Sequence, residues 1–330
     1  MRWLRRQSRC ILALASSYIL GHDAVLAMLG YVNRRWLGGR IKTVFMYYPA
    51  SQAYADAVCY RWHQRRFGWR PGLVGVFLQN GQVGLSFAIP NTESDFKEAA
   101  NAARVDGLMR QMDTIRRRVG AAHKRFAGIL PSIFVNRGIA DQDIGVQRTL
   151  TARAVLAALD DVIGRHHLPA DVPVLILGGR GFIAREVLEL SAGRNMLSID
   201  AGQLAEFRAM IRPMRGHPLI IVNLTKSGAL AEYIAYLWPG SIVLNEVYPE
   251  PSTHEIAAMQ SLGNACYHIA GIRASCWPAF PRAYRGGIPC CASLPLGEHE
   301  RVEVVVIALA GGRPARPPAK APQDSVAAVS

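Results

Sequence analysis

The chain has 330 residues, of which 50% are hydrophobic and 19% are charged, and its formal net charge is +14. This length accommodates two ordinary domains, and the composition excludes an intrinsically disordered chain. The charge indicates a basic surface, but no known nucleic-acid-binding motif accompanies it, so we expect no binding to DNA or RNA.

The N-terminal region carries most of this positive charge, because residues 1–70 hold twelve Lys and Arg but only Asp23 and Asp56 as acids. An apolar run follows the basic start, and it is too short to span a bilayer before His22 and Asp23 interrupt it. We therefore expect one or two core or interfacial helices over residues 3–30. A basic flank beside an apolar helix is also typical of peripheral membrane contact, which residues 1–40 would make.

A strand and a helix are predicted next. Residues 41–49 are β-branched and aromatic and end at a proline, which predicts a strand. Residues 51–66 have helical periodicity and begin at Ser51, a favourable N-cap residue. The predicted apolar face of this helix consists of Tyr54, Ala57, Val58 and Trp62.

A β-hairpin is predicted over residues 73–90, since Asn80 and Gly81 supply the two positive φ angles of a type I′ turn. A helix with apolar periodicity is expected to follow as far as Gly120. Its apolar positions are Ala103, Val105, Leu108, Met109, Met112 and Ile115.

The middle of the chain introduces a regular alternation of strands and helices. The run 126–135 predicts a strand, or a strand broken at Pro131, and residues 149–167 predict a helix. From Pro173 to Gly271, short apolar strands alternate with helices, which specifies parallel strands with helices on both faces. The expected fold class is α/β, with a doubly wound, Rossmann-like parallel sheet preceded by a smaller α/β domain.

This pattern divides the chain into four segments. Residues 1–150 are predicted to form an N-terminal α/β substrate domain, with a basic helical start over 1–40. Residues 151–285 would form the Rossmann domain that binds NAD(P). Residues 286–310 would form a C-terminal return segment with a late strand over 301–310, and the Pro/Ala-rich residues 311–330 are expected to be a disordered tail.

The stretch VLILGGRGFIAREVLEL, residues 174–190, breaks from a strand into three glycines and then becomes a helix. A first glycine permits the tight turn, Gly181 lets the backbone approach a pyrophosphate, and Ala184 lets the helix lie close to the strand. The start of the helix offers N–H groups and the positive end of its dipole to the phosphates. The residues assigned to the cofactor by this pattern are Gly178, Gly179, Arg180, Gly181, Phe182 and Ile183.

Asp200 ends the second strand of this sheet, nineteen residues after Gly181. A carboxylate at that place accepts hydrogen bonds from the adenosine ribose and repels a 2′-phosphate, which favours NAD over NADP. Arg180 favours NADP, because its guanidinium can meet that phosphate. The alternative is a tight turn without a ligand, with Asp200 as a helix cap.

The nicotinamide end of the cofactor is expected where the later strands end. Candidate residues there are Asn223, Leu224, Thr225, Lys226, Asn245, Glu246, Tyr248 and Gly271. Lys226 is a candidate catalytic general acid or substrate clamp, and the alternative is a solvated loop lysine.

Cys290 and Cys291 lie in GIPCCAS, after the last strand of the sheet. A cysteine near a helix start can have a lowered pKa and act as a catalytic nucleophile, and the alternative is two small buried residues. The six cysteines of the chain follow no repeated spacing and include no Cys-x-x-Cys pair. We therefore expect free thiols, a cytoplasmic location and no metal site.

Residues 172–272 resemble the nucleotide domain of shikimate-dehydrogenase-like and methylenetetrahydrofolate-dehydrogenase-like enzymes, in which a catalytic α/β part precedes the Rossmann part. A fainter resemblance, over about half the chain, is to the cyanobacterial long-chain acyl-carrier-protein reductases. Its motifs are FAGILPSIFVNRG, VLILGGRGFIA, SIVLNEVYP, CYHIAGI and GIPCCAS. The first resemblance implies an NAD(P)-dependent dehydrogenase, and the second implies an acyl-thioester substrate with Cys291 or Cys290 as nucleophile.

These features together predict an NAD(P)-dependent oxidoreductase that transfers hydride to a small-molecule carbonyl or an acyl thioester. Two alternatives stay open. One is a sensor or scaffold protein that binds NAD(P) without turnover, and the other is a membrane-surface protein that uses its basic N-terminus.

Overall fold

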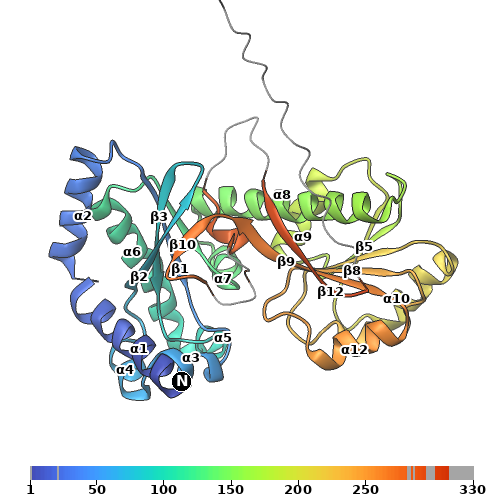
Figure 1. Cartoon of the computed structure of the whole chain (residues 1–330), viewed down its shortest axis with the longest axis horizontal. Coiled ribbons are helices and arrows are strands. Elements are labelled where there is room, and N and C mark those ends of the chain that lie inside the picture. The colour runs from blue at the N-terminus through green and yellow to red at the C-terminus, as the bar shows by residue number, and fades with distance from the viewer. Residues whose placement is uncertain (1, 21, 281–283, 285–286, 295–301, 312–330) are drawn as a thin grey trace, which may run out of the picture.

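A computed structural model of the chain describes residues 2–20, 22–280, 284, 287–294 and 302–311. Two β-sheets organise these residues, and the long helix α8, Gln142–His166, runs along both of them (Figure 1). This helix begins earlier than predicted, because the carboxylate of Asp141 caps it by accepting the Asp143 N–H at 2.9 Å. The predicted tail lies outside the described residues, apart from its first residue.

The first sheet has the strand order β10-β2-β3-β1-β4. Its strands are β1, Ile41–Tyr47; β2, Gly72–Gln79; β3, Gln82–Ala88; β4, His123–Phe126; and β10, Ser275–Trp277. β1 pairs in parallel with β3 and β4, whereas β2 and β3 form an antiparallel hairpin. The φ angles of Asn80 and Gly81, 49° and 72°, confirm the predicted turn. Strand β10 comes from late in the chain, so both ends of the sequence build this sheet.

Helices α2 and α6 pack together on one face of the first sheet, and α1, α3 and α4 lie below them at the same end of the molecule (Figure 1). The predicted apolar positions of α6 are buried with Met46 of β1, except for Ala103, which is exposed. The helices of this part are α1, Arg2–Ala15; η1, Ser16–Leu20; α2, Asp23–Arg35; α3, Gln52–Val58; α4, Arg61–Phe67; α5, Glu93–Lys97; η2, Ala99–Asn101; α6, Ala102–Val119; and α7, Leu130–Asn136.

The helix predicted over 51–66 is two short helices with a break at Cys59. The predicted apolar face is also wrong, since Trp62 is 49% exposed. Buried polar contacts hold the segment instead. Cys59 Sγ lies 2.9 Å from His63 Nδ1, and His63 Nε2 lies 2.8 Å from Ser17 Oγ, so the sulfur and the imidazole face inward.

The strand predicted over 126–135 is wrong beyond its first residue. Strand β4 ends at Phe126, Gly128 turns the chain with φ 57°, and Pro131 stands in the first turn of α7. Proline fits there because the first N–H groups of a helix have no intrahelical partner. The proline therefore marks the start of a helix and not an interruption of a strand.

The second sheet has the order β11-β9-β8-β7-β5-β6, with β12 paired to β9. Its strands are β5, Val174–Leu177; β6, Met196–Ile199; β7, Ile220–Asn223; β8, Ile242–Asn245; β9, Ala265–Arg273; β11, Gly287–Ile288; and β12, Val304–Ala310. Strands β5 to β9 are parallel, as predicted, and β12 is the predicted late strand. The order reverses between β5 and β7, and α/β sheets bind ligands at such a point.

Alternate residues of β5 face opposite helical layers. Val174 and Ile176 pack with α8 and α9, whereas Leu175 and Leu177 pack with α10, α11 and α12. The helices are α9, Phe182–Leu190; α10, Leu204–Ile211; η3, Arg212–Met214; α11, Ala231–Ile234; α12, Thr253–Ser261; and η5, Cys290–Ala292. The sheet is thus covered on both faces, as its run of apolar strands requires.

Candidate functional site

The turn from β5 to α9 has room only for glycine at its three glycine positions. A Cβ at Gly178, which has φ 95°, would lie 2.9 Å from the Leu224 carbonyl oxygen. A Cβ at Gly179 would lie 2.6 Å from the side chain of Ser198, and one at Gly181 would lie 2.9 Å from the carbonyl oxygen of Gly178. The turn is therefore held between the ends of β6 and β7, at the point where the strand order reverses.

Helix α9 begins directly after this turn, with Gly181 as its N-cap. Glycine supplies no capping side chain, so the first N–H groups of the helix are left for an external acceptor. The ring of Phe182 packs beside the core of the first sheet, with the Arg148 guanidinium 5.6 Å from its centroid. Ala184 is fully buried, which lets the helix lie close to the sheet as predicted.

Asp200 and Arg180 form an ion pair beside the turn. Asp200 Oδ1 accepts the backbone N–H of Arg180 at 2.9 Å, and Oδ2 lies 3.0 Å from Arg180 Nε. Asp200, which is expected to favour NAD, and Arg180, which is expected to favour NADP, therefore lie side by side. The carboxylate holds the turn, and the exposed guanidinium extends from it into solvent.

A row of buried polar side chains crosses the carboxyl edge of the second sheet. Asn223, Asn245 and His268 are register partners on β7, β8 and β9. Asn223 Nδ2 donates to Asn245 Oδ1 at 2.7 Å, and Thr225 Oγ1 donates to Asn223 Oδ1 at 2.6 Å. Burial lowers the pKa of His268, so its ring is neutral near pH 7. The amide of Asn223 and the hydroxyl of Thr225, both predicted cofactor contacts, thus bond to each other and shape the loop after β7.

Glu246 follows β8 at this same edge, and its N–H donates to the Asn223 carbonyl oxygen at 3.2 Å. Burial raises the pKa of its carboxyl group from 4.5 to about 7. A carboxylic acid with this pKa exchanges protons near neutral pH, which is the property of a general acid or base.

Cys290 and Cys291 are close enough to Glu246 to interact with it electrostatically, but they lack the expected activation. Burial, reinforced by the charge of Glu246, raises the pKa of Cys291 to about 12, and the pKa of Cys290 is also raised. The predicted lowering is wrong because burial disfavours the charged thiolate.

The first sheet contributes to this region through Tyr48, which follows β1. Tyr48 Oη accepts the Ile129 N–H at 2.8 Å, and a methyl group at Gly128 would overlap the same oxygen. Burial and then the charge of Glu93 raise the pKa of Tyr48, with a smaller contribution from Cys291. Cys291 thus interacts electrostatically with both Tyr48 and Glu246, which brings the ends of β1 and β8 to one place.

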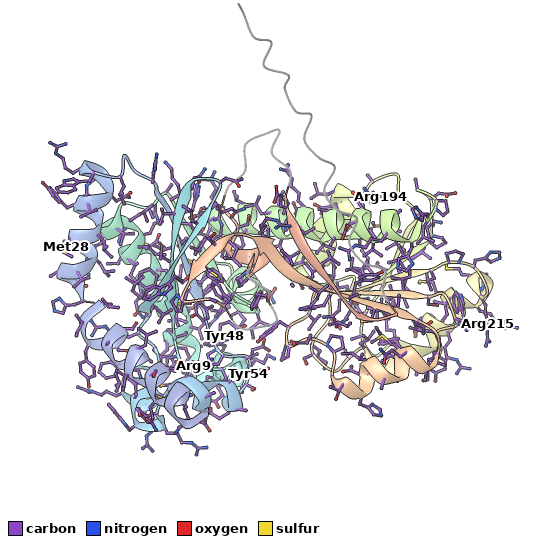
Figure 2. All side chains as sticks on the ribbon, in the orientation of Figure 1. Arg9, Met28, Tyr48, Tyr54, Arg194 and Arg215 are labelled. Carbon is purple, nitrogen blue, oxygen red and sulfur yellow. The ribbon has the colours of Figure 1, made fainter. Side chains whose placement is uncertain are left out.

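Aromatic rings continue this junction between the two parts. The rings of Tyr248 and Tyr284 stack at 5.4 Å, and that of Tyr54 lies 6.3 Å from Tyr248. Figure 2 shows Tyr48 and Tyr54 on the side of the first part that faces the second. Sequence reasoning missed Tyr48, Tyr54 and Tyr284; the available signal for Tyr48 was a phenol directly after a predicted strand.

Two predicted site residues lie outside this arrangement. The side chain of Lys226 is exposed on the loop after β7. Gly271 has φ 120° within β9, and a methyl group there would overlap the Ile288 carbonyl oxygen. Its space accommodates β11, and its assignment to the cofactor stays a prediction. Among the described residues, no group of three or more His, Cys, Asp or Glu is arranged to hold a metal ion.

No family model and no curated protein matches this sequence. Among solved structures, the chain is similar to a shikimate dehydrogenase in complex with NADP+, with 13% identity and a TM-score of 0.37 over 70% of this chain and 85% of that one. It is also similar to VinN in complex with L-aspartate, with 12% identity and a TM-score of 0.24 over 82% of this chain and 77% of that one. Both are distant likenesses, and the chemistry of the site has to be argued from its own residues.

Proposed function

We propose that this chain is an NAD(P)-dependent oxidoreductase that transfers hydride between the dinucleotide and a carbonyl substrate. The observation that supports this most strongly is the turn between β5 and α9, whose three glycines are packed so closely that a methyl group on each would lie 2.6–2.9 Å from a neighbouring atom. The turn opens a helix at the reversal of strand order, which is where α/β sheets bind dinucleotides.

The residues along the carboxyl edge of the second sheet could bind each part of such a dinucleotide. The N–H groups of Phe182 and Ile183 would bind the pyrophosphate, and Asp200 would accept hydrogen bonds from the adenosine ribose. The nicotinamide would be held at the ends of β7 and β8, between Asn223 and Glu246, and when bound it supplies or accepts the hydride.

Glu246 is the group that we assign to the proton of the reaction. With a pKa of about 7, it can donate a proton to the carbonyl oxygen during reduction and accept one during oxidation. The neighbouring groups Cys291, Tyr48 and Tyr284 have raised pKa values, so they stay protonated and can orient the substrate by hydrogen bonding.

The first test is titration of the purified protein with NADH and with NADPH, followed by nucleotide fluorescence. Saturable binding that Gly181→Ala weakens supports the assignment of the turn, and binding of neither nucleotide overturns the proposal. A panel of ketones, aldehydes and alcohols then tests turnover. Saturable binding without any turnover would identify a sensor or scaffold protein instead.

An acyl-thioester reductase is the second candidate, and it is favoured by the electrostatic interaction between Cys291 and Glu246. Cys291 Sγ would attack the thioester carbonyl as the thiol proton passes to Glu246, and the thiol of the carrier would leave. An acyl thioester added without nucleotide would then leave an acyl group on the parent chain and on Cys290→Ser, but not on Cys291→Ser. Full activity of Cys291→Ser with a thioester would remove this candidate.

A further inference from the structure

The N-terminal helices expose an unusual number of large apolar side chains. Trp36 is 77% exposed, Met28 is 59% exposed and Tyr31 is 58% exposed. Ile11, Tyr18, Ile19 and Leu37 are exposed as well. Scattered apolar residues are normal on a protein surface, but a contiguous group of them marks an interaction site.

Helix α2 has one buried face and one exposed face. Its inner face packs on α6, where Leu26 is buried and a methyl group at Gly30 would overlap the Arg118 carbonyl oxygen. Ala24, Ala27, Met28 and Tyr31 are exposed at helical spacing on the opposite face. Figure 2 shows Met28 at the outer edge of the molecule, directed away from both sheets.

Positive charge borders this apolar stripe at the C-terminal end of α2. Arg35 is exposed next to Trp36, whereas Arg34 is exposed at the edge toward α6, where its Nη1 atom would lie 3.2 Å from a methyl group at Gly30. The acid of this helix, Asp23, is paired with Arg118. The surface therefore combines an apolar stripe with cations, and an anionic lipid bilayer has the complementary combination of acyl chains and phosphates.

The packing of α2 indicates whether this helix would lie on a membrane or cross it. Within the described residues no single helix is long and apolar enough to cross, although the segments Arg6–Leu20 and Asp23–Arg35 pass the same test as a pair bent by 79°. The contact between Gly30 and α6 keeps the inner face of α2 on the protein. Only the outer face of α2 is therefore left to contact a partner, as in a helix that lies in the membrane interface.

We propose that α2 and the segment after it, residues 23–37, form a docking surface for anionic phospholipid bilayers. Met28, Tyr31 and Trp36 would enter the headgroup region, and Arg35 would meet the lipid phosphates. The surface lies at the end of the molecule away from the second sheet, so docking leaves the proposed nucleotide site accessible (Figure 1).

Sedimentation of the full chain with vesicles tests this proposal. We expect binding to vesicles of equal parts phosphatidylglycerol and phosphatidylcholine, and little binding to phosphatidylcholine alone. Trp36→Ser should weaken the partition coefficient roughly tenfold or more, because a large apolar side chain no longer leaves water. Arg35→Gln should weaken the partition coefficient about fivefold, and added salt should weaken it as well, because both reduce the attraction to the lipid phosphates.

Trp277→Ser is the matched control, since Trp277 is an exposed tryptophan on β10, outside the docking surface. It should bind vesicles like the parent chain, and all variants should bind NADH like the parent chain. The proposal is overturned if anionic vesicles do not sediment the protein, or if Trp36→Ser and Trp277→Ser behave alike. It is also overturned if Trp36→Ser converts a dimer to a monomer without changing vesicle binding, which would identify a dimer interface. Release from vesicles by detergent but not by high salt would overturn it as well, because that result identifies an integral membrane segment.

Discussion

At the scale of single residues, Glu246 carries the strongest prediction about the reaction. Glu246→Gln keeps the size of the side chain but removes its exchangeable proton, so kcat/KM should fall roughly 10²- to 10⁴-fold. In the parent chain, carbonyl reduction should decline as pH rises through about 7, and alcohol oxidation should rise over the same range. Steady-state rates from pH 5 to 9 in both directions measure this. An inflection near pH 7 that persists in Glu246→Gln would assign it to another group.

The same carboxyl group should lower stability at alkaline pH. Its pKa is 4.5 ordinarily and about 7 in the folded protein, so the folded state holds its proton more tightly. Stability is therefore lost as pH rises from 4.5 to 7, by about 3 kcal/mol at most. Urea unfolding should show Glu246→Gln to be more stable than the parent chain at pH 8 and equal to it at pH 4. The exposed Glu189→Gln is the control and should show no such difference.

Asp200 and Arg180 set the expected choice of nucleotide. Asp200→Asn removes one negative charge near the ribose but keeps the Oδ1 atom that accepts the Arg180 N–H. The ratio of the Kd for NADPH to the Kd for NADH should therefore fall roughly tenfold, because repulsion of the 2′-phosphate is lost. Fluorescence titration with both nucleotides measures the ratio. An unchanged ratio would restrict Asp200 to holding the turn.

The site residues differ in how far local sequence could predict them. The turn around Gly181 could be predicted because its chemistry lies in consecutive residues, a strand end, glycines and a helix start. The environment of Glu246 could not, because Cys291, which interacts with it electrostatically, comes from a distant part of the chain. For the same reason the raised pKa of Cys291 reverses the expected lowering: burial is a property of the folded chain.

At the scale of elements, the turn before α9 can be tested with two glycines, Gly181 at the N-cap of α9 and Gly145 within α8. A methyl group at Gly181 would lie 2.9 Å from a carbonyl oxygen, whereas one at Gly145 in α8 would meet no atom within 4 Å. Gly181→Ala should weaken NADH binding about tenfold through strain in the turn. Gly145→Ala should leave binding unchanged and add about 1 kcal/mol of stability. Titration and urea unfolding of both variants separate these effects, and equal binding by the two would remove the turn from the cofactor site.

The elements that could be predicted are those with strong local rules. Asn80-Gly81 fixes its hairpin, and the apolar strands from Val174 onward fix the parallel sheet. The segment after Phe126 could not be predicted by periodicity, because a short apolar run suits a strand or a buried helix equally well. Its outcome depends on Gly128, whose turn is packed against Tyr48.

At the scale of the whole molecule, the two sheets should unfold together. Phe45 and Phe77 of the first sheet share one hydrophobic core with Val174 and Ile176 of the second. Helix α8 runs along both sheets, and β10 adds a late segment of the chain to the first sheet (Figure 1). Unfolding either part alone would expose the core of the other, which favours one cooperative transition.

Two buried free cysteines report on the two parts separately, Cys59 near the first sheet and Cys266 in the second. We expect pulsed thiol labelling across a urea series, read by peptide mass spectrometry, to give the same midpoint for both. Circular dichroism should give that midpoint as well, because secondary structure disappears in the same step. If Cys59 became reactive at clearly lower urea than Cys266, the N-terminal part would unfold by itself. The shared core would then be weaker than its burial indicates, and the junction between Tyr48 and Cys291 would open while the second sheet stays folded.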